Sequence, residues 1–525
     1  MIADKVLTPG SQPVDERDVG GYVSEHSNIG SQSETSKGED LLAEHGQDPA
    51  LSSKIRLVNN AIDELGWTPY HTKLFFLNGF GYAVDSLVML LQSVIAGQAF
   101  REFGEVGYAT AMTIALYCGM FVGSLFWGLG ADIIGRRHAF NFSLIICCIA
   151  TIVAGAMPNW PSLGLFISLI GFGAGGNLVL DTTVFLEFLP GNKQWVVTMM
   201  ACWWGIGQAI TGFFAWGFLV PDQWNCASVD TCTRANNMGW RYVMFASGAL
   251  VFVMSVLRLT LVQLKETPKY LLGMGEDEKV VETFESLAKK YNRPCSLTVK
   301  KLEACGVTAV NSTTTGFSIG DTLTHIRGLF VTRKTTVSTL MIWLSWIMIG
   351  LVYPLFYAFL PNYLASRGAD LDVTPFEKWR NYALTNVSGV FGPFLAGWMC
   401  NIPFLGRRYT MLIGALLTAV FFFAYTAVRT KDQNVGFSCA IGFCLNIYYG
   451  TLFAYTPEVL PSAHRATGNG FAVAGNRVMG ALSAVIATEA DTSTSAPIYI
   501  CGALFAGLGI VAAMFPFEPY GRRSS

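Results

Sequence analysis

The sequence predicts an all-α polytopic membrane protein with twelve transmembrane helices in two duplicated six-helix halves. Composition is the first reason: of 525 residues, 52% are hydrophobic and 14% are charged, whereas a soluble domain has about 25% charged residues. The second reason is a series of apolar runs, many of which approach or exceed the roughly 20 helical residues that cross a bilayer core. The third is a set of short motifs that recur 271 positions apart.

Four motif pairs have this offset, and each pair takes the same place in the hydrophobic pattern. Arg136 and Arg407 form the first pair, and both come just before an apolar run. The others are Glu187-Phe-Leu-Pro190 with Glu458-Val-Leu-Pro461, Gly79-Phe-Gly-Tyr82 with Gly350-Leu-Val-Tyr353, and Ile170-Gly171-Phe172 with Ile441-Gly442-Phe443. Four matches at one offset predict parallel halves related by an axis along the membrane normal.

The apolar runs place the spans at 72–95, 107–130, 138–157, 161–184, 195–219, 242–263, 336–362, 380–400, 409–428, 434–456, 468–488 and 496–516. Basic residues gather in the short even-numbered connections, which hold Arg136, Arg137, Lys193, Arg407, Arg408 and Arg465. Basic residues beside a membrane exit mark the cytosolic side. We therefore expect both termini in the cytosol, and we expect the plasma membrane as the location.

The predicted domains follow from these spans. Residues 1–70 form a cytosolic tail that is largely disordered, since polar residues dominate the first 50 positions. Within it, 51–66 has apolar residues at helical spacing, which fits either an interfacial helix or a short cytosolic helix that touches only protein. The rest divides into a six-helix bundle at 71–263, a cytosolic linker with short helices at 264–335, a second bundle at 336–516 and a cytosolic tail at 517–525.

Several classes of function are disfavoured. The sequence has no Gly-x-Ser-x-Gly, no phosphate-binding glycine loop and no paired histidine ligands, so an enzyme is not expected. No cysteine spacing suggests a metal or haem, and no cofactor is expected. No basic stretch interleaved with aromatic residues suggests nucleic acid. Cys226 and Cys232 share a predicted outer loop, where they form a disulfide or remain two free thiols.

Two acids lie inside predicted spans, where a charge is costly and faces a cavity or a partner. Asp85 and Asp181 are candidates for carrying protons, because burial favours the neutral carboxyl and an approaching cation favours the carboxylate. The alternative is a structural carboxylate with a permanent partner. The offset places Phe356 and Leu452 at the corresponding positions of the second half, so neither acid is kept in both halves.

Arg477 is the third charge inside a span. Its guanidinium is always ionised and makes two-pronged contacts with carboxylates, which favours a clamp for an anion. An internal ion pair with Asp85 or Asp181 is the alternative. Other candidates to line a cavity are Asn476, Tyr353, Tyr357, Asn386, Asn446, Gln208 and Trp204, although each also fits a packing role.

Four motifs carry a family resemblance, which covers roughly residues 70–517. Gly128-x-x-x-Asp132-x-x-Gly135-Arg136-Arg137, between the second and third spans, resembles the signature of the major facilitator superfamily. Gly175-Gly176-Asn177-Leu178 through Pro190, and Tyr455 through Gly470, are similar to its fungal synaptic-vesicle-protein-like branch. Lys265-Glu266-Thr267-Pro268-Lys269 resembles the element that closes the sixth span of sugar-porter-like members.

The resemblance implies the major facilitator fold and alternating access. It also implies that rim charges form a network that closes the inner gate: Asp132, Arg136, Arg137, Glu187, Arg407, Arg408, Glu458 and Arg465. The alternative is that these arginines only orient the chain. The setting of Arg477, from Asn476 to Gly480, resembles the eleventh-span arginine of organic-anion carriers.

The expected function is therefore proton-coupled uptake of a small polar solute, an organic acid or a sugar or polyol. The expected partners are that solute, protons and the lipid bilayer. Proton-driven efflux of toxic compounds or secondary metabolites remains an alternative, and so does a non-transporting receptor or vesicle protein of the same fold.

Overall fold

The structure is a computed structural model that describes residues 49–104, 107–108, 110–134, 136–260, 266–307, 323, 326–366, 374–461, 464–489 and 496–520. Inside helices, the side chains of 129, 131–134, 136–138, 140, 177–180, 357–366 and 466 lie outside this description. Every regular element in the described residues is a helix. The predicted disorder of the first 48 residues therefore stays a prediction.

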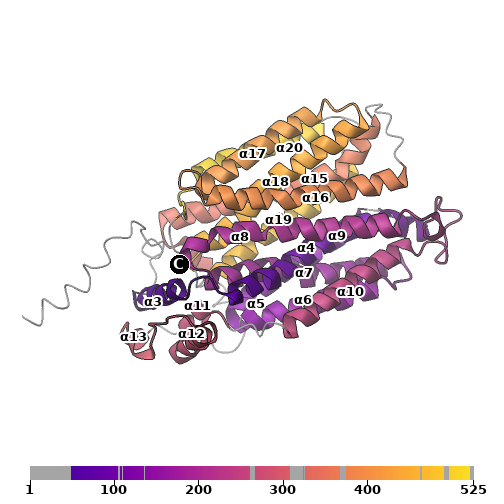
Figure 1. The fold of residues 1–525 in the computed structure, drawn as a ribbon. Helices are drawn as coiled ribbons and strands as arrows, with labels where there is room; N and C mark the ends of the chain where they lie inside the picture. The colour runs from indigo at the N-terminus through magenta and orange to yellow at the C-terminus, as the bar shows by residue number, and fades with distance from the viewer. Residues whose placement is uncertain are drawn as a thin grey trace, which may run out of the picture. The chain divides into compact units, whose positions relative to one another are not determined.

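The predicted spans correspond to two groups of helices, which Figure 1 colours indigo to magenta and orange to yellow. The first half holds α4 (Pro69–Glu102), α5 (Ala111–Ile134), α6 (Arg136–Ala154), α7 (Trp160–Phe188), α8 (Trp195–Met200), α9 (Cys202–Phe218) and α10 (Gly239–Thr260). The second half holds α15 (Arg333–Ser366), α16 (Pro375–Cys400), α17 (Gly406–Tyr425), α18 (Lys431–Val459), α19 (Arg465–Glu489) and α20 (Ala496–Met514).

Ten helical segments of the described chain are long and apolar enough to cross a membrane, with α8 and α9 together forming one of them. The two remaining predicted spans are helical as well. They are α6, whose apolar part is Asn141–Ala154, and α16, which begins with Glu377, Lys378 and Arg380 in its first two turns. The predicted all-helical membrane fold is confirmed.

The repeat is visible in the helix bounds. Helix α7 runs from Trp160 to Phe188, and α18 runs from Lys431 to Val459, so both ends are shifted by 271 positions. The side chain that caps each helix is shifted likewise. Asn159 accepts a hydrogen bond from the Ser162 amide (2.9 Å), and Thr430 accepts one from the Gln433 amide (3.3 Å). Such caps satisfy amides that have no partner within the helix.

The halves meet along α5 and α19. At Gly470 of α19, a Cβ atom would lie only 3.0 Å from the Ser124 carbonyl oxygen of α5, so the two backbones touch there. Near the other end of the same helices, the hydroxyl groups of Thr110 and Thr488 are 2.8 Å apart. The halves are thus in contact at both ends of this seam.

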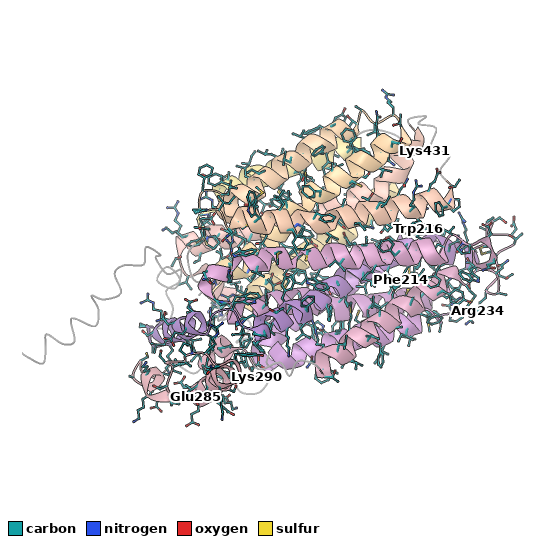
Figure 2. The ribbon with its side chains drawn as sticks, in the orientation of Figure 1. Phe214, Trp216, Arg234, Glu285, Lys290 and Lys431 are labelled. Carbon is teal, nitrogen blue, oxygen red and sulfur yellow. A yellow bond between two sulfur atoms is a disulfide. The ribbon has the colours of Figure 1, made fainter. Side chains whose placement is uncertain are left out.

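A second seam joins α9 and α16. A Cβ at Gly205 would lie 2.7 Å from the Val390 amide nitrogen, so this approach also needs glycine. Towards the end of α9, the ring centroids of Trp216 and Phe376 are 5.5 Å apart. Figure 2 shows Trp216 on the side of α9 that faces the second half.

A small helical domain caps one end of the bundle, which we call the linker end (Figure 1). It consists of α3 (Pro49–Leu65), α11 (Pro268–Gly273), α12 (Asp277–Tyr291) and α13 (Val299–Glu303). Its core contains Ile55, Val58, Ala61, Ile62, Leu65, Leu271, Leu272, Val280, Val281, Phe284, Ala288, Leu297 and Leu302. A buried ion pair between Lys54 and Asp277 (2.5 Å) joins α3 to α12. The apolar face of α3 therefore packs on protein.

The opposite end, the loop end, carries the connection between α9 and α10. Figure 2 labels Arg234 in this connection, far from Glu285 and Lys290 of α12 at the linker end. Cys226 and Cys232 are joined there by a disulfide. The second half has no connection of this length between α19 and α20, which is where the two repeats diverge.

Candidate functional site

The predicted gate residues lie at the linker end. Glu187 is in the last turn of α7, and Arg465 is the first residue of α19, so they come from different halves. The Arg465 Nη1 donates to Glu187 Oε1 at 3.2 Å, and both side chains are fully buried. An ion pair therefore bridges the halves at this end.

The corresponding acid of the second half has its partner within that half. Arg407 donates through Nε (3.0 Å) and Nη2 (2.9 Å) to the two carboxylate oxygens of Glu458. The Arg407 Nη1 also donates to the Cys400 carbonyl oxygen at 3.2 Å. This is a side-on bidentate contact, the strongest geometry for this pair of groups.

The other gate candidates are placed differently. Arg408 points along α20, where its Nη2 donates to the Ala513 carbonyl oxygen at 2.5 Å and its amide to Glu518 at 3.0 Å. It does not bridge the halves. The side chains of Asp132, Arg136 and Arg137 lie outside the described residues, so their part in the network stays a prediction.

Hydrogen bonds from α4 and α3 fix the end of α7 beside Glu187. His71 of α4 donates through Nε2 to the Phe188 carbonyl oxygen (2.9 Å). Asp63 of α3 accepts a hydrogen bond from the Gly191 amide (2.8 Å), just after α7 ends. The linker-end domain is thereby connected to the segment that carries the inter-half ion pair.

A second group of candidates lies between the halves, along one face of α4. Gly81, Asp85 and Met89 follow one another at intervals of four residues, which places them on roughly one side of the helix, about 6 Å apart along its axis. Asp85 is fully buried. Gly81 and Met89, on either side of Asp85 along this face, each lie beside an arginine. Arg258 of α10 lies against Gly81, and Arg477 of α19 contacts Met89.

Arg477 is fully buried and has no acidic partner among the described residues. Its Nη1 donates to Asn476 Oδ1 and to Met89 Sδ, both at 3.4 Å. Its Nε and Nη2 have no hydrogen-bond partner in the described part of the chain, and no described carboxylate lies within ion-pair distance. The hydroxyl groups of Tyr117 and Tyr449 interact electrostatically with the Arg477 guanidinium.

Asp181 has a basic partner instead. Arg258, in the last turn of α10, donates through Nη2 to Asp181 Oδ1 at 2.8 Å, and both side chains are buried. The ion pair that would have joined Asp181 to Arg477 is not present.

The remaining cavity candidates divide into two groups. Gln208 of α9 donates a hydrogen bond to the Tyr353 hydroxyl of α15, and Trp204 packs against the rings of Tyr449 and Phe453 of α18. These contacts join the halves beside Arg477. Asn476 donates to the Trp346 carbonyl oxygen at 3.1 Å.

Two further candidates, Asn446 and Asn386, are buried in the second half. Asn446 donates to the Gly442 carbonyl oxygen of its own helix at 2.8 Å, and Asn386 is buried in α16. The side chain of Tyr357 lies outside the described residues.

A family model described as the Major Facilitator Superfamily matches residues 74–484. The chain belongs to this superfamily. The match spans both halves and both groups of candidate residues, and it agrees with the repeat described above. The superfamily's members are transporters, so membrane transport is the function that this membership indicates.

The names of similar proteins contain different substrates. The MFS siderochrome iron transporter 1 of Ceriporiopsis subvermispora (strain B) is 38% identical over 497 residues, 92% of this chain and 94% of that protein. The niacin transporter NiaP of Acinetobacter baylyi is 24% identical over 434 residues, 82% and 89% of the two chains.

A solved structure shares the superfamily fold. The proton:xylose symporter XylE, bound to 6-bromo-6-deoxy-D-glucose, aligns with a TM-score of 0.66 at 16% identity, over 87% of this chain and 98% of that one. At this identity the likeness describes the fold alone. The substrate of this superfamily member therefore has to be argued from its own residues.

Two buried arginines of this superfamily member were not among the sequence candidates. Arg258 pairs with Asp181, and Arg241 of α10 pairs with Glu102 of α4 at 2.5 Å. The Trp240 indole nitrogen also donates to Glu102 (2.8 Å), so the second cluster ties α4 and α10 together at the loop end. The sequence does contain a sign of both, because Arg258 lies within the apolar run 242–263 and Arg241 lies directly before it.

Proposed function

We propose that this protein is a secondary active transporter that takes up a small organic anion together with protons, by alternating access. The observation that carries the proposal is the free edge of the Arg477 guanidinium at the interface between the halves. Membership of the superfamily supports transport, and the geometry around Arg477 supports the class of solute.

The free edge has the shape that a carboxylate needs. Arg407 uses Nε and Nη2 to bind both oxygens of Glu458, and in Arg477 the same two nitrogens have no hydrogen-bond partner in the described chain. Asn476 and Met89 contact Nη1 only, so they orient the guanidinium without occupying this edge. A buried cation without a counter-charge is costly, and a bound carboxylate would remove that cost.

Asp85 supplies the link to protons. It lies one turn of α4 from Met89, which contacts Arg477, and two negative charges this close repel each other in a partly buried site. An anion therefore binds Arg477 better when Asp85 carries a proton. By thermodynamic reciprocity, the bound anion also favours the proton on Asp85. The two bind and move together, which is symport.

The contacts between the halves supply the gates. In the expected orientation, the Arg465–Glu187 pair closes the cytosolic end, while the Thr110–Thr488 contact lies at the outer end. The halves rock about the two seams when one of these contacts opens. A transporter needs both contacts to break in alternation, so that the centre is never open to both sides.

The name of one relative supports this class of solute. NiaP is named a niacin transporter, and niacin is a pyridine carboxylate, whose two oxygens match the two free nitrogens of the Arg477 edge. The siderochrome iron relative shows that larger solutes also occur among similar proteins. We therefore use nicotinate as the first probe and other monocarboxylates beside it.

The test is binding to purified protein by calorimetry and thermal shift. Nicotinate and nicotinamide form a matched pair that differ in charge but hardly in shape, and benzoate and lactate extend the set. We expect the carboxylates to bind and the amide not to bind. Arg477→Lys should weaken binding at least tenfold, since a point charge cannot make the two-pronged contact.

Thr418→Ala removes a buried hydroxyl that donates to the Gly414 carbonyl oxygen of its own helix; it is the matched control and should bind as the wild type does. If no carboxylate binds the wild type, or if Arg477→Lys binds it equally well, the proposal is wrong. Uptake is separated from efflux in proteoliposomes: an inwardly directed proton gradient should drive accumulation, and a protonophore should abolish it.

Efflux of apolar compounds is the second candidate, and one observation favours it. An apolar groove of about 240 Å³ lies between α5, α15 and α19, lined among others by Phe121, Trp343 and Phe471. Such a groove would admit a solute from the bilayer. If Phe471→Ser lowers resistance to lipophilic toxins in cells and leaves nicotinate binding unchanged, efflux becomes the better description.

A further inference from the structure

Ser296 lies in the connection between α12 and α13 of the linker-end domain. This connection, 293–298, is not helical, and Arg293, Pro294 and Ser296 are exposed. Leu297 is the buried residue of the stretch and belongs to the core of the domain. A segment with so few buried contacts opens locally at low cost, so an enzyme can reach the Ser296 hydroxyl.

The spacing of Arg293 and Ser296 is the one that arginine-directed protein kinases select. The arginine lies three positions before the serine, where a carboxylate of such a kinase pairs with the guanidinium. Ser286 of the same domain is exposed too, but Thr283 stands three positions before it. In the expected orientation the linker end faces the cytosol, which supplies ATP to protein kinases.

Ser296 contacts the last turn of α3 through two atoms. Its Oγ donates to Glu64 Oε1 at 2.6 Å, and its amide donates to Glu64 Oε2 at 2.8 Å. Near its other end, α3 is joined to α12 by the ion pair of Lys54 with Asp277. The contact of Glu64 with Ser296 therefore fixes the end of α3 that leads into α4.

A phosphate on Ser296 would break this contact. The esterified Oγ has no hydrogen to donate, and the phosphate oxygens would face the Glu64 carboxylate, where like charges repel. Lys301 offers a cation close by, since its Nζ donates to the Ser296 carbonyl oxygen at 2.7 Å. The phosphate therefore has a partner for a charge-assisted hydrogen bond once it has moved away from Glu64.

The last turn of α3 also holds the end of α7. Asp63, next to Glu64, accepts a hydrogen bond from the Gly191 amide at 2.8 Å. Glu187 lies in the last turn of α7 and pairs with Arg465 of the other half. A displacement of Glu64 moves Asp63 with it, so it weakens the support of the inter-half ion pair.

We propose that Ser296 is a phosphorylation site for an arginine-directed protein kinase and that its phosphate loosens the gate at the linker end. This inference rests on the proposed function for that gate and for its cytosolic side, but not for the solute. In the transfer, the Ser296 Oγ attacks the γ-phosphorus of ATP, the bond from that phosphorus to the bridging oxygen breaks, and ADP leaves. The hydroxyl proton passes to a base of the kinase. Phosphorylation then shifts the carrier toward the state open to the cytosol.

The first measurement maps the modification on the purified full-length protein. Incubation with ATP and an activated calmodulin-dependent protein kinase should place phosphate on Ser296, as read by mass spectrometry of peptides. Arg293→Ala should slow this incorporation roughly tenfold or more, because the kinase loses the guanidinium that it binds. Ser286 is the internal control and should stay unmodified.

The second measurement follows the gate by thiol labelling. Ser124→Cys places a thiol at a buried position of α5 that faces α19, in a chain whose exposed and partly exposed cysteines are replaced by alanine. Phosphorylation should raise the rate of maleimide labelling about threefold, the size expected for one exposed charge contact. Ser296→Asp should raise the rate in the same direction, whereas Ser296→Asn, of the same size but uncharged, should not.

Glu64→Gln separates the proposed route from a general effect of charge. The amide oxygen of this variant still accepts a hydrogen bond from Ser296 but has no charge to repel the phosphate. Phosphorylation of Ser296 should therefore leave the labelling rate of this variant unchanged. Glu187→Gln removes the inter-half ion pair directly and is the positive control for an opened gate.

Three results would overturn the inference. The first is an absence of phosphate on Ser296 after incubation with the kinase. The second is an unchanged labelling rate of the phosphorylated parent while Glu187→Gln accelerates labelling, which would leave the gate intact as a proposal. The third is equal acceleration by phosphate in Glu64→Gln, which would mean that the phosphate acts by another route. None of these measurements uses a solute, so the anion site stands or fails separately, on nicotinate binding.

Discussion

The ion pair between Glu187 and Arg465 provides a test of the gate that can be quantified. Glu187→Gln keeps the size of the side chain but removes its charge. Arg465 is fully buried at 3.2 Å from that carboxylate, so in the closed state its charge would lose a counter-charge without gaining water. Breaking a buried pair in this way costs about 3–5 kcal/mol. In a state open at the linker end, water reaches Arg465 and removes most of this cost.

The expected size of the effect follows from this difference. A change of about 3 kcal/mol alters the ratio of closed to open molecules by roughly 150-fold, at about 1.4 kcal/mol per factor of ten. Molecules that are closed about 99% of the time would then be mostly open. The change should therefore be visible at equilibrium as well as in transport rates.

Thiol labelling provides the assay. Ser124 is fully buried in α5 and faces Gly470 of α19 across the seam, so Ser124→Cys gives a small reporter that opening exposes. Among the described cysteines, Cys118 is exposed and Cys295, Cys305 and Cys439 are partly exposed, so all four have to be replaced first. We expect a maleimide added from the linker end to label the reporter at least tenfold faster in Glu187→Gln.

Glu458→Gln is the matched control. It also leaves a buried arginine, Arg407, without its acid, but that pair lies within one half and does not hold the halves together. Its thermal stability should fall while the labelling rate stays near that of the parent. Equal acceleration by both substitutions, or none by Glu187→Gln in folded protein, would refute the reasoning.

Three further predictions concern packing and stability. Gly81→Ala places a Cβ against the carboxylate of Asp181 and should lower the free energy of unfolding, measured by thermal denaturation, by about 1–3 kcal/mol. Gly97→Ala has open space around it and should lower this free energy less, so equal losses would argue against the close approach at Gly81. Cys232→Ser opens the loop closed by the disulfide, whose cysteines are 6 positions apart, and should lower stability by about 2 kcal/mol, an effect that reductant should reproduce in the parent. Val58→Asp puts a charge into the core of the linker-end domain and should make the chain near Gly66 sensitive to protease; resistance equal to that of the parent would contradict the packing of α3.

Much of the architecture follows from local properties of the chain. Span length and the 271-position offset predict the helices and the repeat because hydrophobic length and motif order do not depend on how the halves face each other. The partner of Glu187 could not be predicted in this way. Symmetry predicts a partner in its own half, as Arg407 is for Glu458, but it does not predict the contact with Arg465, which lies 278 positions away.

Arg258 illustrates a different kind of omission. It lies inside the run 242–263, which was interpreted as a span, and the argument applied to Asp181 holds for it equally. Its partner is 77 positions away, and the absence of a side chain at Gly81 makes the contact possible. Sequence reasoning could have flagged the charge, but only the packing of α4, α7 and α10 shows which acid receives it.

The motif that begins at Glu187 in the first half and at Glu458 in the second differs between the halves at one position beside the inter-half ion pair. In the second copy Glu458 is followed seven positions later by Arg465, and in the first copy Glu187 is followed at the same distance by Gln194. An amide forms hydrogen bonds but has no net charge. Among the described residues, the halves are therefore joined here by one charged contact where full symmetry would allow two. If this end reopens in each transport cycle, as the proposed function requires, a single charged contact makes opening less costly than two would.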